Sequence, residues 1–301
     1  MRTFPFDEYG VLYRDRAVGV GWTSTQLARA VHAGDLLRID TGTYAEAVPR
    51  PPADLHMLRV RAALERDPDL TFTHQSAAVI HRLPLLTPDL SRIDVVSARR
   101  ARRRSLRLRT VPLVPEETVV VDGLSVTSLE RTAVSVACTS PMGFAGALTV
   151  FDGALSQGAS RQSMTRMLDA PMHGVAVARR ALALADADSA NPAESWSRAQ
   201  MIEGGLPHPR LQHEFYDANG FVARSDFDWD GVLVAEFDGY GKYEDYNIYG
   251  QTPIDVLKRE KRRQARLEDL GVDIVRLEWL HLERRLVVPR IKPRLLRLGL
   301  I

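Results

Sequence analysis

The alternation of hydrophobic and polar residues changes along the chain, and each change predicts a new set of elements. Near the amino terminus, Leu27 and Val31 lie one helical turn apart, residues 23–24 can cap a helix, and Gly34 can end one. Two short apolar runs then flank a glycine-containing turn at 40–42. We therefore expect a helix followed by a β-hairpin, which is the end of a winged helix-turn-helix.

The rest of the chain divides at a proline cluster near residue 50 and at a polar, small-residue hinge at 185–192. In the middle part the pattern predicts helices near 55–66, 74–82, 128–139, 143–156 and 160–168, and strands near 92–97, 106–111 and 118–122. In the last part it predicts helices at 192–203 and 254–270 and strands at 211–216, 221–228, 232–238 and 273–277. The expected fold class is α/β in an α+β multi-domain chain: a winged helix (1–50), a mixed α/β middle domain (51–187) and a mixed sheet flanked by helices (188–301).

An acidic hairpin in the last part carries the candidate chemistry. The turn at 228–231 would place Asp226 and Glu236 on neighbouring strands, with Asp238 on the same face as Glu236. Glu236 interrupts an apolar strand, where a carboxylate is costly without a partner. Three converging carboxylates favour a divalent cation, Mg²⁺ or Mn²⁺. The alternative is a set of surface-facing acids.

The last part also resembles the PD-(D/E)XK nuclease superfamily, in its branch similar to Vsr-like endonucleases. The matching segments are Asn191-Pro192-Ala193-Glu194-Ser195, Gly205-Leu206-Pro207-His208-Pro209 with Gln212, residues 226–243 and residues 260–279. The resemblance implies a restriction-endonuclease-like sheet in which Asp226 and Glu236 bind the catalytic metal. It also implies that Glu194 is a further ligand or orients water.

One position departs from the superfamily pattern. Its lysine would stand two residues after the second acid, where this chain has Asp238. Lys242 is the nearest candidate to take that role, because a lysine amine can lose its proton or orient water. A surface lysine on a glycine-flanked loop is the alternative.

The segment 27–45 resembles the winged helix of AbiEi-type antitoxins, the transcriptional regulators of type IV toxin–antitoxin systems. Segments 73–78 and 126–132 resemble parts of proteins that join such a helix to a Vsr-like domain. The resemblance implies DNA contacts by Gln26, Arg29 and Arg38.

Basic residues gather in two further places. Seven arginines stand within 99–109, where they repel one another unless an anion neutralises them, and nucleic-acid phosphate is the commonest such anion. The expected DNA contacts in this run are Arg99, Arg100, Arg102, Arg103 and Arg104. On the helix 254–270 they are Lys258, Lys261 and Arg262. The alternatives are solvated faces or arginines paired with carboxylates.

Composition sets further limits on disulfides, metal sites and location. The 301 residues carry a net charge of +2 and one cysteine, so disulfides within the chain are excluded and Cys138 is expected in a core. His74 and His81 are expected as core or rim residues rather than as a metal pair. With no apolar run long enough for a membrane and no signal-peptide core at the start, a cytoplasmic location is expected.

These features lead to two hypotheses of different classes. The first is a DNA-binding, Mg²⁺- or Mn²⁺-dependent endonuclease that hydrolyses phosphodiester bonds. The second is a non-catalytic, AbiEi-like antitoxin or transcriptional repressor with a degenerate nuclease fold, whose partners would be DNA and a cognate toxin.

Overall fold

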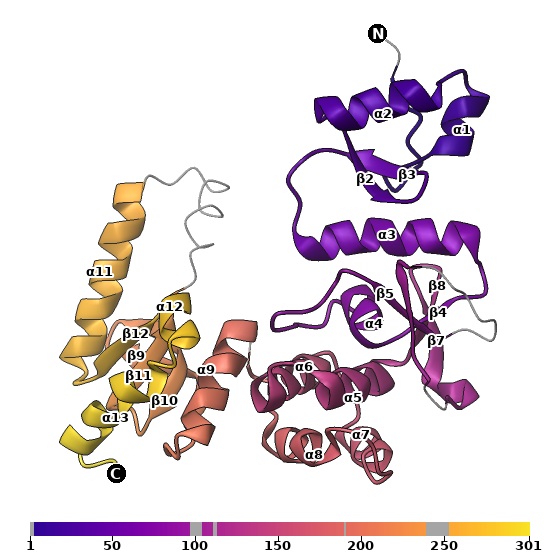
Figure 1. Cartoon of the computed structure of the whole chain (residues 1–301). Coiled ribbons are helices and arrows are strands. Elements are labelled where there is room, and N and C mark those ends of the chain that lie inside the picture. The colour runs from indigo at the N-terminus through magenta and orange to yellow at the C-terminus, as the bar shows by residue number, and fades with distance from the viewer. Residues whose placement is uncertain (1–2, 97–103, 111–112, 190, 239–252) are drawn as a thin grey trace. The chain divides into compact units, whose positions relative to one another are not determined.

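The computed structural model describes residues 3–96, 104–110, 113–189, 191–238 and 253–301 (Figure 1). The fold is mixed α/β and multi-domain, and the described strands form three sheets. Contacts divide the chain into two compact units. One contains Met1–Ser140 and Gln162–His173, and the other contains Pro141–Arg161 and Gly174–Ile301.

The first unit begins with the expected helix and hairpin. Its elements are β1 (Val11–Tyr13), α1 (Arg14–Gly19), α2 (Ser24–Ala33), β2 (Leu36–Asp40) and β3 (Thr43–Glu46). Thr23 and Gln26 form a capping box at the start of α2, and Gly34 ends it at a φ of 81°. The strands pair antiparallel in the order β1-β3-β2. Leu12, Leu27 and Leu36 pack together beneath α2. The winged-helix order of elements is therefore present.

The rest of the first unit is built on a five-stranded sheet. Its elements are α3 (Pro52–Arg66), β4 (Thr71–Phe72), α4 (His74–Ile80), β5 (Ile93–Val96), β6 (Leu106–Leu108), the 3-10 turn η1 (Pro115–Glu117), β7 (Thr118–Val121), β8 (Leu124–Thr127) and α5 (Leu129–Thr139). The sheet order is β6-β5-β4-β8-β7. The segment Gln162–His173 also belongs to this unit, and it contains most of helix α7 (Arg161–Met167). The predicted helices and strands are present, and the two strands of this sheet without a prediction are the short β4 and β8.

The second unit holds the acidic hairpin within a four-stranded sheet. Its strands are β9 (Arg210–Asp217), β10 (Gly220–Trp229), β11 (Leu233–Phe237) and β12 (Asp273–Leu277), in the order β12-β11-β10-β9. Only β11 and β12 run parallel among these pairs. The helices are α6 (Gly143–Ser156), α8 (Val175–Leu184), α9 (Pro192–Glu203), α11 (Pro253–Asp269), α12 (Trp279–Glu283) and α13 (Val287–Arg297).

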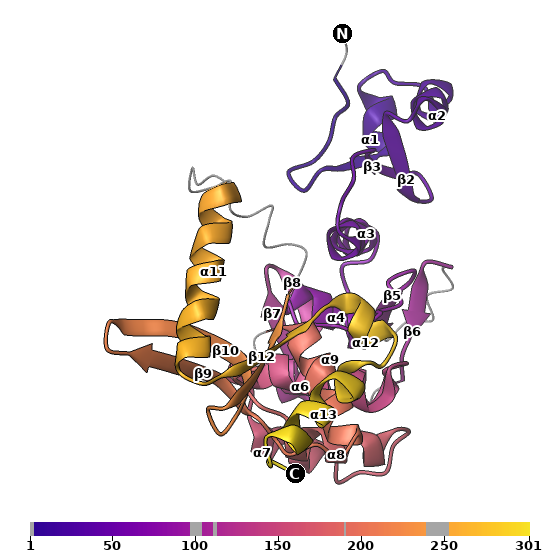
Figure 2. The ribbon, with the colours of Figure 1, turned by 90° about the vertical axis from the view of Figure 1, so that its left-hand side faces the viewer.

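The two faces of this sheet have different cores. Phe227 and Ala235 pack with residues of α9, α12 and α13 on one face. Val234 packs with Leu267 of α11 on the other face. Figure 2 shows α11 beside β10. Because side chains alternate along a strand, Asp226 and Glu236 belong to the α11 face.

A buried ion pair fastens α6 to α9 within the second unit. Asp152 is fully buried, and its carboxylate accepts hydrogen bonds from the Arg198 guanidinium at 2.5 Å and from Ser195 Oγ at 2.7 Å. The backbone N–H of Asp186 also donates to Asp152, at 2.8 Å. Helix α6, which the sequence pattern placed in the middle domain, therefore packs with α9 of the second unit. The division into three domains stays a prediction.

Three smaller expectations concern single side chains. Cys138 is buried, and burial raises the pKa of its thiol to about 11. His74 is buried, and the ring of His81 lies 2.8 Å from the carbonyl oxygen of Thr127, so both are core or rim residues as expected. None of the helices in the described ranges combines the length and the apolar character needed to cross a bilayer.

Candidate functional site

The register of β10 and β11 brings the two predicted metal ligands to one place. Phe227 pairs with Ala235 in this antiparallel ladder, so one further step sets Asp226 opposite Glu236. Asp226 Oδ2 accepts a hydrogen bond of 2.7 Å from the Phe237 N–H. The two acids are thus on adjacent strands, as predicted, and share the α11 face of the sheet.

Two arginines form ion pairs with the Glu236 carboxylate. Arg263 of α11 donates to both of its oxygens, with N···O distances of 2.7 Å and 2.7 Å. Arg276, the neighbour of Glu236 across the β11–β12 register, lies 3.1 Å from the same carboxylate. Since Glu236 is nearly buried, it needs a partner, as the sequence indicated, and here that partner is guanidinium.

Glu260 closes this ion-pair network into a ring. Arg263 donates to Glu260 at 2.6 Å and 3.0 Å, and Arg276 also donates to it. The two guanidinium groups lower the pKa of Glu260 to about 2, and the carboxylates raise the pKa of Arg263. Two acids and two bases of α11, β11 and β12 therefore neutralise one another. We call Glu236, Glu260, Arg263 and Arg276 the ion ring.

The expected cluster of three carboxylates is not formed by the residues described. Among them, no three His, Cys, Asp or Glu side chains come together in a way that could hold a metal ion. Asp238 is half-buried at the end of β11, and its N–H donates to the Leu277 carbonyl at 2.7 Å. With the Glu236 oxygens held by two arginines, this arrangement of residues does not fit a Mg²⁺ or Mn²⁺ site.

Glu194 has a role at the start of α9. The Asn191 side chain caps the helix by accepting from the N–H groups of Ala193 and Glu194 at 2.9 Å and 3.0 Å. The Glu194 carboxylate in turn accepts from the Asn191 amide and, at 3.1 Å, from the Gln212 amide of β9. Glu194 therefore links the helix cap to the sheet, which explains the buried position of its side chain without a metal.

The turn aspartates behave as their sequence context indicates. Asp228 Oδ1 accepts from the Gly231 N–H at 2.9 Å, and Asp230 adopts a φ of 54°. Asp228 also has a structural partner that the sequence did not reveal, because Arg210 Nε donates to it at 2.7 Å.

Part of the predicted site lies outside the described residues. Lys242 falls within 239–252, and Arg99, Arg100, Arg102 and Arg103 fall within 97–103. The roles given to these residues stay predictions.

The outer face of α2 is a candidate nucleic-acid interface. Gln26 and Arg29 are exposed, whereas Leu27 and Ala30 face the core. Gln26 Oε1 accepts from the Thr23 N–H at 2.8 Å, so this side chain also caps the helix. Arg29 makes no ion pair among the described residues, so its charge is available to an anion.

The remaining basic residues separate into paired and unpaired sets. Arg107 and Arg109, in the arginine run, are held by the fully buried Asp94, at 3.7 Å and 2.8 Å. On α11, Arg266 pairs with Asp217 at 2.6 Å. Among the predicted DNA contacts outside the winged helix, the exposed residues for which the described ranges show no carboxylate partner are Arg104, Lys258, Lys261 and Arg262. Arg38 is exposed on β2, and its Nε lies 3.3 Å from the Asp40 carbonyl.

Sequence reasoning missed the residues that complete the ion ring. Arg263 and Arg276 lie in the segments that the sequence predicts as the helix 254–270 and the strand 273–277, and neither receives a role there. A signal for Arg276 exists, because aligning β11 with β12 as parallel neighbours sets it beside Glu236. The signal for Arg263 is its spacing of three residues from Glu260 on one helix.

Comparison with known proteins finds relatives for part of the chain. No family model matches it. Two curated relatives, both uncharacterized proteins of Mycobacterium tuberculosis strains, are each 35% identical to it over 102 residues. The match covers 34% of this chain and 35% of each relative, so the chain spans about a third of the length of the curated relatives it matches.

Proposed function

We propose that the protein is a DNA-binding regulator that contacts duplex DNA through α2 and the β2–β3 hairpin. The observation that carries the proposal is the amphipathic α2: its apolar side packs into the small core of the winged helix, and its polar side, with Arg29, faces solvent. A capped helix of this kind beside a hairpin suits insertion into the major groove. Action on DNA would place the protein in the cytoplasm, and an antitoxin-like regulator would have a cognate toxin as a second partner.

The ion ring supports a non-catalytic role for the second unit. Arg263 and Arg276 hold two positive charges against the Glu236 carboxylate, and these charges disfavour a divalent cation at the same place. Asp238 at the position of the superfamily lysine points the same way.

Metal-dependent cleavage of DNA is the second candidate function. The observation in its favour is that Asp226 and Glu236 share one face of adjacent strands. For them to bind Mg²⁺ or Mn²⁺ together, Arg263 would have to leave Glu236.

Binding is tested first, by fluorescence anisotropy with a random-sequence duplex pool at several salt concentrations. We expect salt-dependent binding that Arg29→Ala weakens about tenfold, the cost of one good contact in the groove. The matched control is Arg284→Ala, which removes an exposed arginine of the second unit. Binding by Arg29→Ala as tight as that of the control would remove α2 from the interface.

Cleavage is tested with supercoiled plasmid in Mg²⁺ or Mn²⁺, with EDTA and Glu236→Ala as controls. If the protein is a regulator, wild type and Glu236→Ala should give equal residual nicking. Metal-dependent nicking by the wild type that Glu236→Ala abolishes would establish the nuclease candidate instead.

A further inference from the structure

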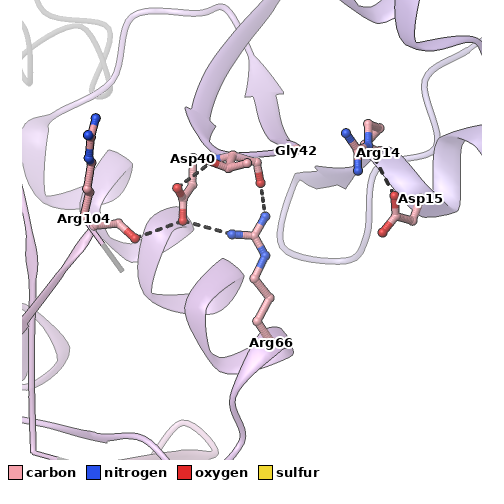
Figure 3. A pocket seen from close by; sticks show the side chains of 8 residues that line it. Arg14, Asp15, Asp40, Gly42, Arg66 and Arg104 are labelled. Atoms are coloured by element: carbon pink, nitrogen blue, oxygen red, sulfur yellow. Dashed lines mark hydrogen bonds and ion pairs between the residues drawn. The ribbon is translucent and has the colours of Figure 1, made fainter. Parts of the chain in front are cut away.

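A cavity at the turn of the β2–β3 hairpin is bordered by arginines from three elements. Its volume is about 480 Å³. The lining residues are Arg14, Asp15, Asp40, Thr41, Gly42, Arg66, Arg104 and Ser105. Arg14 begins α1, Arg66 ends α3, and Arg104 lies just before β6. Figure 3 shows the head of Arg66 between Arg104 at one end and Arg14 at the other.

One of the two aspartates that line this cavity, Asp40, is already paired. Asp40 Oδ2 accepts from Arg66 at 3.0 Å and from Ser105 Oγ at 3.2 Å, and Oδ1 accepts from the Thr41 N–H at 2.7 Å. Because these donors satisfy Asp40, its charge opposes an incoming anion less than a solvated carboxylate would.

The same interactions fix Arg66. Its guanidinium also donates to the Thr41 carbonyl and to Thr43 Oγ1, so the side chain is held against the hairpin turn (Figure 3). An arginine that is already ordered gives up little further freedom when a ligand binds.

Arg14 and Arg104, on either side of Arg66, are available to bind a ligand. Arg14 contacts Asp15 at 3.3 Å, but the two side chains are 51% and 90% exposed, and an ion pair this exposed is weak. Arg104 is exposed and has no ion-pair partner in the described ranges. The Arg14 side chain lies over Gly42, where a φ of 62° suits glycine and a Cβ would come within 3.7 Å of Arg14 Cβ.

We propose that this cavity is a phosphate site, in which Arg14 and Arg104 bind phosphate groups at either end of Arg66. Three arginines and two aspartates leave the lining with a charge of +1, and arginine forks match phosphate oxygens. The spread of the arginines along the cavity suits a ligand with more than one phosphate. Such groups occur on the DNA backbone and on small phosphate compounds, and only the DNA source rests on the proposed function.

The first arm of the test uses no DNA. Pyrophosphate is titrated into the full chain by calorimetry at constant ionic strength, with orthophosphate for comparison. We expect saturable pyrophosphate binding by wild type and by the control Arg284→Gln, and at least tenfold weaker binding by the double variant Arg14→Gln, Arg104→Gln. The single variant Arg104→Gln breaks no ion pair of the described residues, so it should fold like the wild type. It should also bind pyrophosphate more weakly than the wild type does.

The second arm measures DNA binding against salt. If backbone phosphates occupy the cavity, the log–log salt slope of the double variant falls by about one unit for each phosphate that is no longer neutralised. A response in this arm alone assigns the site to DNA, and a response to pyrophosphate alone assigns it to a small compound. Should the double variant match Arg284→Gln in both arms, the site does not exist. Failure of the α2 proposal shows separately, because Arg29→Ala leaves the pyrophosphate arm unchanged.

Discussion

Arg263 donates to both oxygens of Glu236, with each N···O distance at 2.7 Å. This bidentate contact supplies the cation that a buried strand carboxylate needs. Arg276 and Glu260 extend the contact into a neutral ring, so the local charge is balanced by side chains of the chain itself.

Breaking the ion ring should destabilise the second unit. Arg263→Ala leaves Glu236 with Arg276 alone, and we expect a decrease in stability of about 2 kcal/mol, below the usual cost of an unpaired buried charge because Arg276 remains. Urea unfolding followed by tryptophan fluorescence measures it, because Trp196, Trp229 and Trp279 all lie in this unit. Arg262→Ala, an exposed neighbour on α11, should leave the midpoint unchanged. Equal midpoints for the two variants would mean that the ring contributes no stability.

The ion ring should also make the stability of the protein decrease in acid. The guanidinium groups of Arg263 and Arg276 lower the pKa of Glu260 from 4.5 to about 2. A carboxyl whose pKa is lower in the folded state stabilises the fold above its unfolded value, and that stability is lost as the pH falls through the folded value. We expect wild type to exceed Glu260→Gln in stability at pH 6 and the two to converge as the pH falls from 4.5 towards 2. A difference that persists undiminished at pH 2 contradicts this assignment.

A buried histidine should limit the stability of the first unit in mild acid. His56 is fully buried, its ring nitrogens lie 3.1 Å from the Leu90 carbonyl and 2.9 Å from Ser76 Oγ, and burial lowers its pKa to about 4. At pH values between 6.5 and 4, His56 binds a proton in the unfolded chain but stays neutral in the folded chain. Stability present above pH 6.5 is therefore lost on acidification, by an amount on the order of 3 kcal/mol.

Urea unfolding by circular dichroism at pH 7.5, 5.5 and 4.5 tests this, with His56→Gln as the variant and His208→Gln, an exposed position, as its control. The stability of His56→Gln should depend less on pH than that of wild type, whereas the control should follow wild type. Parallel curves for all three proteins would assign the acid sensitivity to other groups.

The unpaired basic residues of α11 should contribute to DNA affinity without sequence preference. Lys258, Lys261 and Arg262 are exposed, whereas Arg263 and Arg266 are already paired. We expect the triple alanine variant to bind all duplexes more weakly and to flatten the salt slope by about one unit for each phosphate that these side chains neutralise in the wild type. An unchanged slope would show that this face of the helix is merely solvated.

Local patterns in the sequence were sufficient for most of the fold. Helix α2 could be delimited because its cap, its apolar stripe and Gly34 are all local signals. Strand β4 was missed because two residues are too few for an alternating pattern. Helix α13 was missed because Pro293 interrupts its pattern, although its apolar residues pack into the core.

The candidate site was less accessible to such reasoning. The sequence indicated that Glu236 needs a partner, but partner identity depends on which side chain of α11 faces β11 and on the register of β12. Both depend on the tertiary structure, which local sequence patterns do not reveal. The arginine run shows the same limit, since Arg109 meets Asp94 only because β5 and β6 pair in parallel.

The ion pair between Asp152 and Arg198 determines where the second unit can be cut free for expression. A fragment beginning at residue 188 would retain Arg198 and discard the carboxylate that pairs with it. It would also discard α6, which packs on α9. A fragment beginning at Pro141 retains both partners and the whole of α6, and it contains every residue of the second unit.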